Sequence, residues 1–91
     1  LLIVAVIFPV TFAALADVCV DAADFALAGG SPAGGTYSGT GVSGTDFSPA
    51  TAGTGTHTIT YTYTDGNGCV NSATSDITVN ALPTVTFAAL A

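Results

Sequence analysis

The fold is decided by residues 56–79, which read THTITYTYT (56–64), DGNG (65–68) and CVNSATSDITV (69–79). In the first arm threonine alternates with His, Ile or Tyr, and this two-residue period is typical of a strand with one buried face. Asp-Gly followed by Asn-Gly predicts a tight turn, because such turns need positive φ angles. In the second arm Ile77 and Val79 share one parity. We therefore predict a long β-hairpin with an apolar face and a threonine-rich face.

The composition predicts a single all-β domain. The chain has 91 residues, of which 49% are hydrophobic, and eleven glycines, but it shows no long helical pattern. A chain of this length makes one domain at most. Frequent glycine, threonine and serine belong to strands and turns, so we predict a β-sandwich. Shorter strands are expected at residues 25–28, where alanine also permits a helix, and at residues 36–38.

The charge balance excludes several partners. The chain has no Lys or Arg, and its six acidic residues give a formal net charge of -6. Binding to nucleic acid, or electrostatic attraction to anionic lipid, needs cationic side chains, so neither is expected. So few charges on such an apolar chain predict poor solubility as a free monomer. We therefore expect self-assembly, or a module of a longer chain.

One seven-residue string occurs twice. Val10–Ala16 reads VTFAALA, and Val85–Ala91 repeats it letter for letter 75 residues later. Repetition at a fixed period is the signature of a tandem array. We predict that residues 10–84 form one repeat unit and that residues 85–91 begin the next.

The first nine residues are almost entirely apolar. They resemble the core of a signal peptide, and Ala14–Ala16 resembles its cleavage site. However, a cleaved signal has no reason to recur at the far end of a domain, and the run is short for a membrane span and contains Pro9. We expect residues 1–9 to form a strand that is buried in this domain or exchanged with a neighbour. The candidate inter-subunit strand residues are Leu2, Ile3, Val4, Val6, Ile7, Phe8, Val85 and Phe87.

The two cysteines, Cys19 and Cys69, stand fifty residues apart. Neither lies in a Cys-x-x-Cys motif, and a single histidine makes a zinc site improbable. We predict a disulfide between them, which would indicate an oxidising, extracellular setting. The alternative is two buried free thiols.

Several strings of residues 17–80 together resemble the Ig-like repeats of very large surface proteins of Bacteroidetes-type bacteria. These strings are Cys19–Asp21 (CVD), Gly29–Val42 (GGSPAGGTYSGTGV), Phe47–Pro49 (FSP), Gly55–Tyr61 (GTHTITY) and Asp65–Cys69 (DGNGC). The resemblance implies an Ig-like β-sandwich of about seven strands, secreted and strung in tandem in adhesins, gliding-associated proteins or surface filaments. It also implies a cysteine at each of the two positions seen here.

Two glycine-rich patterns offer enzymatic alternatives. Gly39–Gly44 fits G-x-G-x-x-G, but Pro49 follows too closely for the helix that a dinucleotide site requires. Gly41–Thr45 falls one residue short of G-x-S-x-G, and a catalytic triad would have to use His57. We expect a turn and a packing histidine instead, and no enzyme.

Two binding alternatives remain. Asp17 and Asp21 are weak candidates for calcium ligands, since calcium prefers oxygen donors, although the spacing is not that of an EF-hand. A glycan could stack on Tyr37, Tyr61 and Tyr63, but the parity of the last two favours core packing. No cofactor is otherwise expected.

Two functions are thus expected from the sequence. The first is a structural module of an extracellular filament or stalk on the bacterial cell surface, joined end to end by β-strand contacts between copies. The second is an adhesin repeat that binds glycan or protein.

Overall fold

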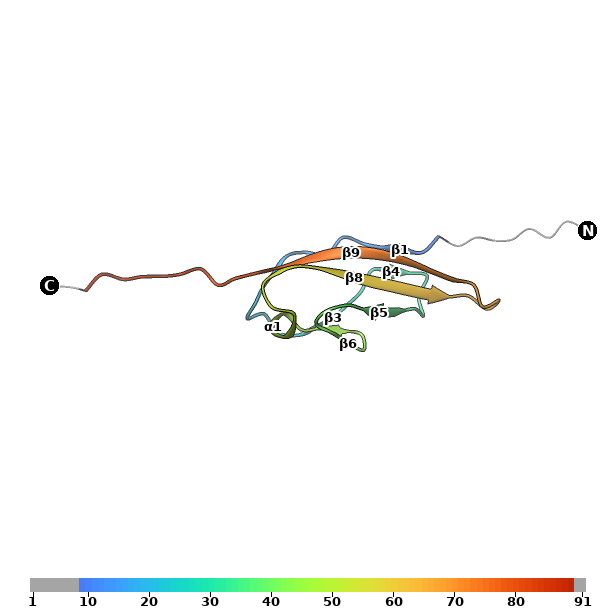
Figure 1. Ribbon diagram of the computed structural model, residues 1–91, viewed down its shortest axis with the longest axis horizontal. Helices are drawn as coiled ribbons and strands as arrows, with labels where there is room; N and C mark the ends of the chain where they lie inside the picture. The colour runs from blue at the N-terminus through green and yellow to red at the C-terminus, as the bar shows by residue number, and fades with distance from the viewer. Residues whose placement is uncertain (1–8, 90–91) are drawn as a thin grey trace, which may run out of the picture.

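The computed structural model describes residues 9–89, which form nine strands and one short helix (Figure 1). The strands are β1 (Thr11–Phe12), β2 (Val18–Cys19), β3 (Phe25–Ala26), β4 (Gly30–Ser31), β5 (Thr36–Ser38), β6 (Val42–Ser43), β7 (Asp46–Phe47), β8 (Gly55–Thr64) and β9 (Val70–Asn80). The helix α1 (Pro49–Ala52) is a single turn, which begins after Ser48, whose hydroxyl accepts from the amide of Thr51 at 3.2 Å. An all-β sandwich is therefore confirmed.

The long hairpin is present as predicted. Strands β8 and β9 pair antiparallel over ten residue pairs, from Gly55 opposite Val79 to Thr64 opposite Val70. The expected apolar face is buried, and Ile59 and Ile77 have no exposed surface. On the opposite face the hydroxyl of Thr58 donates to the carboxylate of Asp76 at 2.8 Å. The alternating residues of the hairpin are therefore buried on one face and form side-chain hydrogen bonds on the other.

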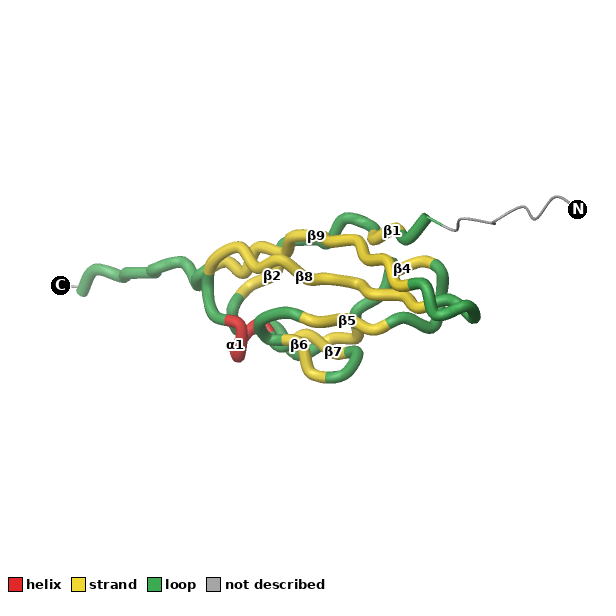
Figure 2. The backbone as a smooth tube through the Cα atoms, turned by 45° about the vertical axis from the view of Figure 1, so that its right-hand side comes forward, coloured by secondary structure: helices red, strands yellow, loops and turns green. Residues whose placement is uncertain are grey.

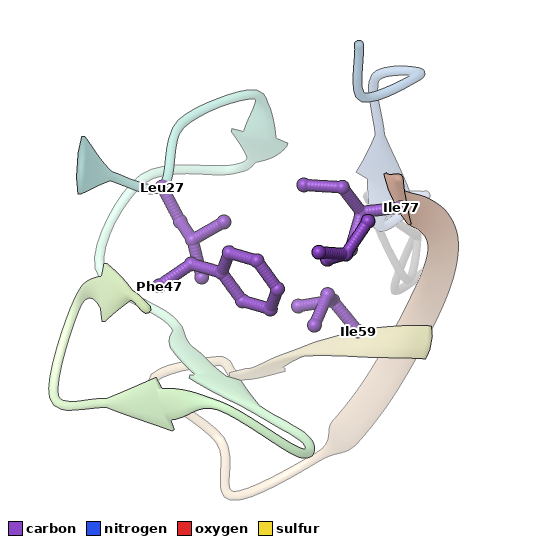
Figure 3. Packing of buried hydrophobic residues seen from close by; sticks show 5 residues of the cluster. Leu27, Phe47, Ile59 and Ile77 are labelled. Carbon is purple, nitrogen blue, oxygen red and sulfur yellow. The ribbon is translucent and has the colours of Figure 1, made fainter. Parts of the chain in front are cut away.

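Three sheets surround one core. The hairpin lies in the centre of a four-stranded sheet of order β2-β9-β8-β5, in which β2 runs parallel to β9 and the other pairs are antiparallel. A three-stranded sheet, β3-β7-β6, supplies the facing layer, and β1 pairs with β4 (Figure 2). Between the layers the buried cluster consists of Leu27, Phe47, Ile59, Ile77 and Val79 (Figure 3).

The turn and the shorter strands differ slightly from expectation. Five residues, 65–69, connect β8 to β9, so the connection is longer than a two-residue turn, and Gly68 has positive φ there. The strand at residues 36–38 is confirmed, whereas the one predicted at residues 25–28 is limited to Phe25–Ala26. No helix in the described part of the chain is long and apolar enough to cross a membrane.

Tyr61 joins the hairpin to the first third of the chain. Its side chain is 2% exposed, and its hydroxyl accepts from the amide of Gly35 at 2.8 Å and donates to the carbonyl of Pro32. Its ring packs on Phe12 and Tyr37, with centroid distances of 6.2 and 4.8 Å. This contact needs glycine beside it, because a Cβ on Gly30 would lie 2.5 Å from the ring of Tyr61.

Gly30→Ala should therefore destabilise the fold. We expect a loss of about 2–3 kcal/mol in the free energy of unfolding, since the added methyl group must displace a buried ring. Gly66→Ala is the matched control: a Cβ there meets nothing within 4 Å, and the change should stay within about 0.5 kcal/mol. Urea unfolding of both variants measures the difference, and equal stabilities would contradict the close packing.

Candidate functional site: the two ends of the sandwich

The chain enters and leaves the sandwich at opposite ends (Figure 1). Of the described residues, Pro9 and Val10 precede β1 and lie on the side of the β8–β9 turn (Figure 1). The chain leaves at Asn80, the last residue of β9. We call the turn at residues 65–69 with Val70 the tip end, and Asn80 with its neighbour Cys19 the exit end.

Asp65 organises the tip end. One carboxylate oxygen accepts from the amides of Asn67 at 2.8 Å and Cys69 at 2.9 Å, and the amide of Asp65 donates to the carbonyl of Cys69 at 2.9 Å. Next to this turn, the side chain of Val70 is 64% exposed. The tip end is thus a defined loop that presents a thiol and an aliphatic side chain.

Strand β2 organises the exit end. Cys19 pairs with Asn80 in the parallel ladder, and the amide of Val20 donates to the carbonyl of Asn80 at 2.9 Å. The carbonyl of Cys19 accepts from the amide of Ala22 at 3.0 Å. Two residues beyond Asn80, Leu82 is 53% exposed. This end therefore also combines a thiol with an exposed aliphatic side chain.

The disulfide predicted within the chain is not formed in the structure. Cys19 and Cys69 are both free and exposed, so the alternative of buried thiols is also wrong. They lie at opposite ends of the eleven-residue strand β9, roughly 35 Å apart at the rise of an extended strand, whereas a disulfide needs Cα atoms within about 7 Å. Spacing in sequence did not reveal at which end each cysteine lies.

The repeated string occupies two different environments. In its first copy, Thr11 and Phe12 form β1, and the ring of Phe12 packs edge-on against Tyr37 at 5.5 Å. In its second copy, Val85 and Phe87 are 84% and 83% exposed and make no regular structure. The other candidate strand residues, Leu2, Ile3, Val4, Val6, Ile7 and Phe8, lie outside the described residues.

The tyrosines do not form an open platform for a sugar. Tyr61 is buried, as its parity predicted, and Tyr37 is half-buried with its hydroxyl accepting from the amide of Gly30 at 3.1 Å. Tyr63 is half-buried. The aromatic rings of Tyr37 and Tyr61 are thus used inside the fold.

The glycine-rich patterns and His57 take part in turns and loop contacts of the fold. Gly39–Gly44 leads into the short hairpin of β6 and β7 rather than into a helix. The ring nitrogen Nε2 of His57 lies 2.8 Å from the carbonyl oxygen of Gly53, so it anchors the chain after α1. Both features have a structural role that the sequence had favoured.

The calcium candidates Asp17 and Asp21 are exposed. Within residues 9–89, no group of three or more His, Cys, Asp or Glu side chains is arranged to hold a metal ion. The two ends of the sandwich therefore remain as the candidate functional surfaces. Sequence reasoning placed Asp65 in the turn but did not predict that its carboxylate accepts from two amides, although the DGNG string offered an Asx turn as a signal.

Asp65→Ala should loosen the tip end. The change leaves the amides of Asn67 and Cys69 without their protein acceptor, and we expect a loss of about 1 kcal/mol in unfolding free energy. Asp65→Asn is the control, since it keeps an acceptor oxygen at the same atom and should lose less. Urea unfolding and amide exchange at these two residues give the readout. Equal losses in both variants would mean that charge, rather than the acceptor, orders the turn.

The comparisons with known proteins agree with this architecture. A family model for the bacterial Ig domain matches residues 5–78, whereas no curated protein and no solved structure matches. Domains of this kind are generally non-catalytic structural modules and typically occur in extracellular or surface proteins. Because the match covers most of the 91 residues, the chain belongs to the bacterial Ig domain family.

Proposed function

We propose that this domain is a structural module of an extracellular filament or stalk on the bacterial cell surface, in which copies join end to end. One observation carries the proposal. The string VTFAALA forms the start of the fold at residues 10–16, near the tip end, and it occurs again at residues 85–91, after the chain has left the sandwich at the exit end. The resemblance to surface-protein repeats of Bacteroidetes-type bacteria supports this setting.

The first copy of the string indicates what the second would do. Phe12 packs on Tyr37 and Tyr61, and Thr11 and Phe12 pair with β4. The identical residues at 85–91 would fill the same position in the following unit. Phe87 would then be buried against the equivalent tyrosines, which removes its apolar surface from water.

The connection would be a strand contact. In each unit β1 adds to β4, so a following unit in the array would receive its first strand directly from the preceding chain. The same arrangement allows residues 1–9 to add to a neighbour at the other end. Self-association is further supported by the exposed apolar side chains of Val85 and Phe87, whose burial between copies must outweigh the repulsion between chains that each carry a formal net charge of -6.

An adhesin repeat is the alternative function. It would be favoured by exposed aromatic rings on the threonine face or on residues 29–44, because such rings bind sugars. Tyr37 and Tyr61 instead pack in the interior. We therefore place the structural module first.

The test compares one substitution in two contexts. A two-unit protein is made from the 91-residue chain followed by a second copy of residues 17–91, so that residues 85–91 serve as residues 10–16 of the second unit. Phe87→Ala should destabilise the second unit by about 2 kcal/mol, because it removes a half-buried aromatic ring from that unit. In the single chain the same substitution should change stability by less than about 0.5 kcal/mol.

Phe12→Ala is the matched control, since it makes the same change in a position already seen to be packed. It should destabilise the first unit in both proteins. Calorimetry and amide exchange in each unit provide the measurement. If Phe87→Ala leaves the second unit as stable as before, residues 85–91 do not begin that unit and the end-to-end connection is wrong.

A further inference from the structure

The two ends of the sandwich carry complementary reactive groups. Cys69 is exposed at the tip end beside the exposed Val70, and Cys19 is exposed at the exit end, near the exposed Leu82. The structure keeps these two thiols apart within one chain. An arrangement of copies that places an exit end against a tip end would bring them together.

The connection between copies sets how close the ends come. Four residues, 81–84, separate Asn80 from the repeated string at Val85. Even when fully extended, this linker advances the chain by no more than about 17 Å. The following unit must therefore begin close to the exit end of the preceding one.

The tip end of that unit reaches back toward the linker. Phe12 packs on Tyr61, which pairs with Ala73, so Cys69 lies about four strand residues, or roughly 13 Å, nearer the tip than Phe12. Val10 lies two residues before Phe12 and therefore about 7 Å nearer the tip than Phe12. Cys69 thus lies about 6 Å farther toward the tip than Val10. Figure 1 shows this turn extending past the first described residues.

The axial gap follows from these lengths. Cys69 of a following unit lies within about 11 Å of Asn80 along the axis with a straight linker, and any bend of the linker shortens this gap toward the disulfide limit of about 7 Å. Cys19 lies beside Asn80 in the adjacent strand. The aliphatic side chains of Leu82 and Val70 are brought to the same junction, where their contact would exclude water.

We infer that Cys19 of one unit and Cys69 of the next form a disulfide that locks the junction. This inference rests on the end-to-end arrangement proposed above. The partner is a second copy of this domain, in the same array, and the bond is absent within a single unit. Each unit would then be linked to its neighbour twice, once through the main chain and once through sulfur.

The step needs an oxidant, for which a low-molecular-weight disulfide such as oxidised glutathione is sufficient. One cysteine thiolate attacks this disulfide, forms a mixed disulfide and releases one glutathione thiolate. The second cysteine thiolate then attacks the protein sulfur of the mixed disulfide and releases the other glutathione. Two protein thiols are oxidised, one glutathione disulfide is reduced, and the two thiol protons pass to the glutathione products.

The test uses two variants of the two-unit protein. The inner-pair variant carries Cys69→Ser in the first unit and Cys19→Ser in the second, so that the two cysteines at the junction remain. The outer-pair variant carries Cys19→Ser in the first unit and Cys69→Ser in the second, and leaves the cysteines at the far ends. Both variants keep two exposed thiols of the same types, so they differ only in where these thiols lie.

In a buffer of reduced and oxidised glutathione, the inner pair should lose both free thiols within one molecule. Its disulfide should form at an oxidant level at least about tenfold lower than any bond of the outer pair, because the linker raises the effective concentration of the two thiols. Thiol labelling and mass spectrometry of peptic fragments identify the bond, since a chain without Lys or Arg offers trypsin no cleavage site. In the single 91-residue chain no disulfide should form between Cys19 and Cys69 of the same molecule.

The contrary outcomes are distinguishable by small-angle scattering of the reduced two-unit protein. If it is a straight rod but the inner thiols stay free, the disulfide is wrong and the end-to-end module stands. If the two units tumble independently and the inner thiols stay free, both are wrong. A Cys19–Cys69 bond within the single chain would also overturn the inference.

Discussion

The fold depends on the antiparallel ladder between β8 and β9. These two strands contain 21 of the described residues and supply Ile59, Ile77 and Val79 to the buried cluster. All other strands are two or three residues long, and such short strands are not stable by themselves. Two of them, β2 and β5, pair with the two edges of the hairpin, and the other strands lie in the two smaller sheets that pack around its apolar face.

Tyr61 extends this dependence to the start of the chain. Its hydroxyl bonds to Gly35 and Pro32, and its ring lies against β4 through the close approach of Gly30. Without an Arg or Lys in the chain, no ion pair from either of these side chains can hold these loops. Hydrogen bonds to the tyrosine hydroxyls, and the close contact between Gly30 and the ring of Tyr61, hold the loops instead. The tyrosine rings are therefore used in the fold and are not free to bind a ligand.

The sequence was sufficient for the hairpin and its buried face. Ile59 and Tyr61 alternate with threonine, and a two-residue period fits a β-strand but not a helix. The structure has a strand there, with both side chains buried. It was insufficient for the ends of the sandwich, because a separation of fifty positions between Cys19 and Cys69 does not reveal at which end of β9 each cysteine lies. The parallel pairing of β2 with β9 decides this, and a two-residue strand leaves no periodic signal.

The ordering of the tip end was only partly evident from the sequence. DGNG predicted a tight turn, but the side chain of Asp65 satisfies two amides at once and so stabilises a five-residue connection. Among residues 65–69 only Gly68 has positive φ, whereas a type I′ turn needs positive φ at two adjacent residues. The periodicity of a sequence predicts which residues are buried, but it carries little information on individual hydrogen bonds such as those to Asp65.

The parallel course of β2 beside β9 also has a mechanical consequence. The chain enters toward one end of β9 and leaves at the other, so tension on the two ends pulls β2 and β9 in opposite directions along their length (Figure 1). The hydrogen bonds between them, together with the one from Val20 to Asn80, then bear the load at the same time as a shear, rather than breaking one after another as in an unzipped hairpin. Although β2 pairs with β9 over only two residues, this orientation of the two strands makes the domain resist stretching.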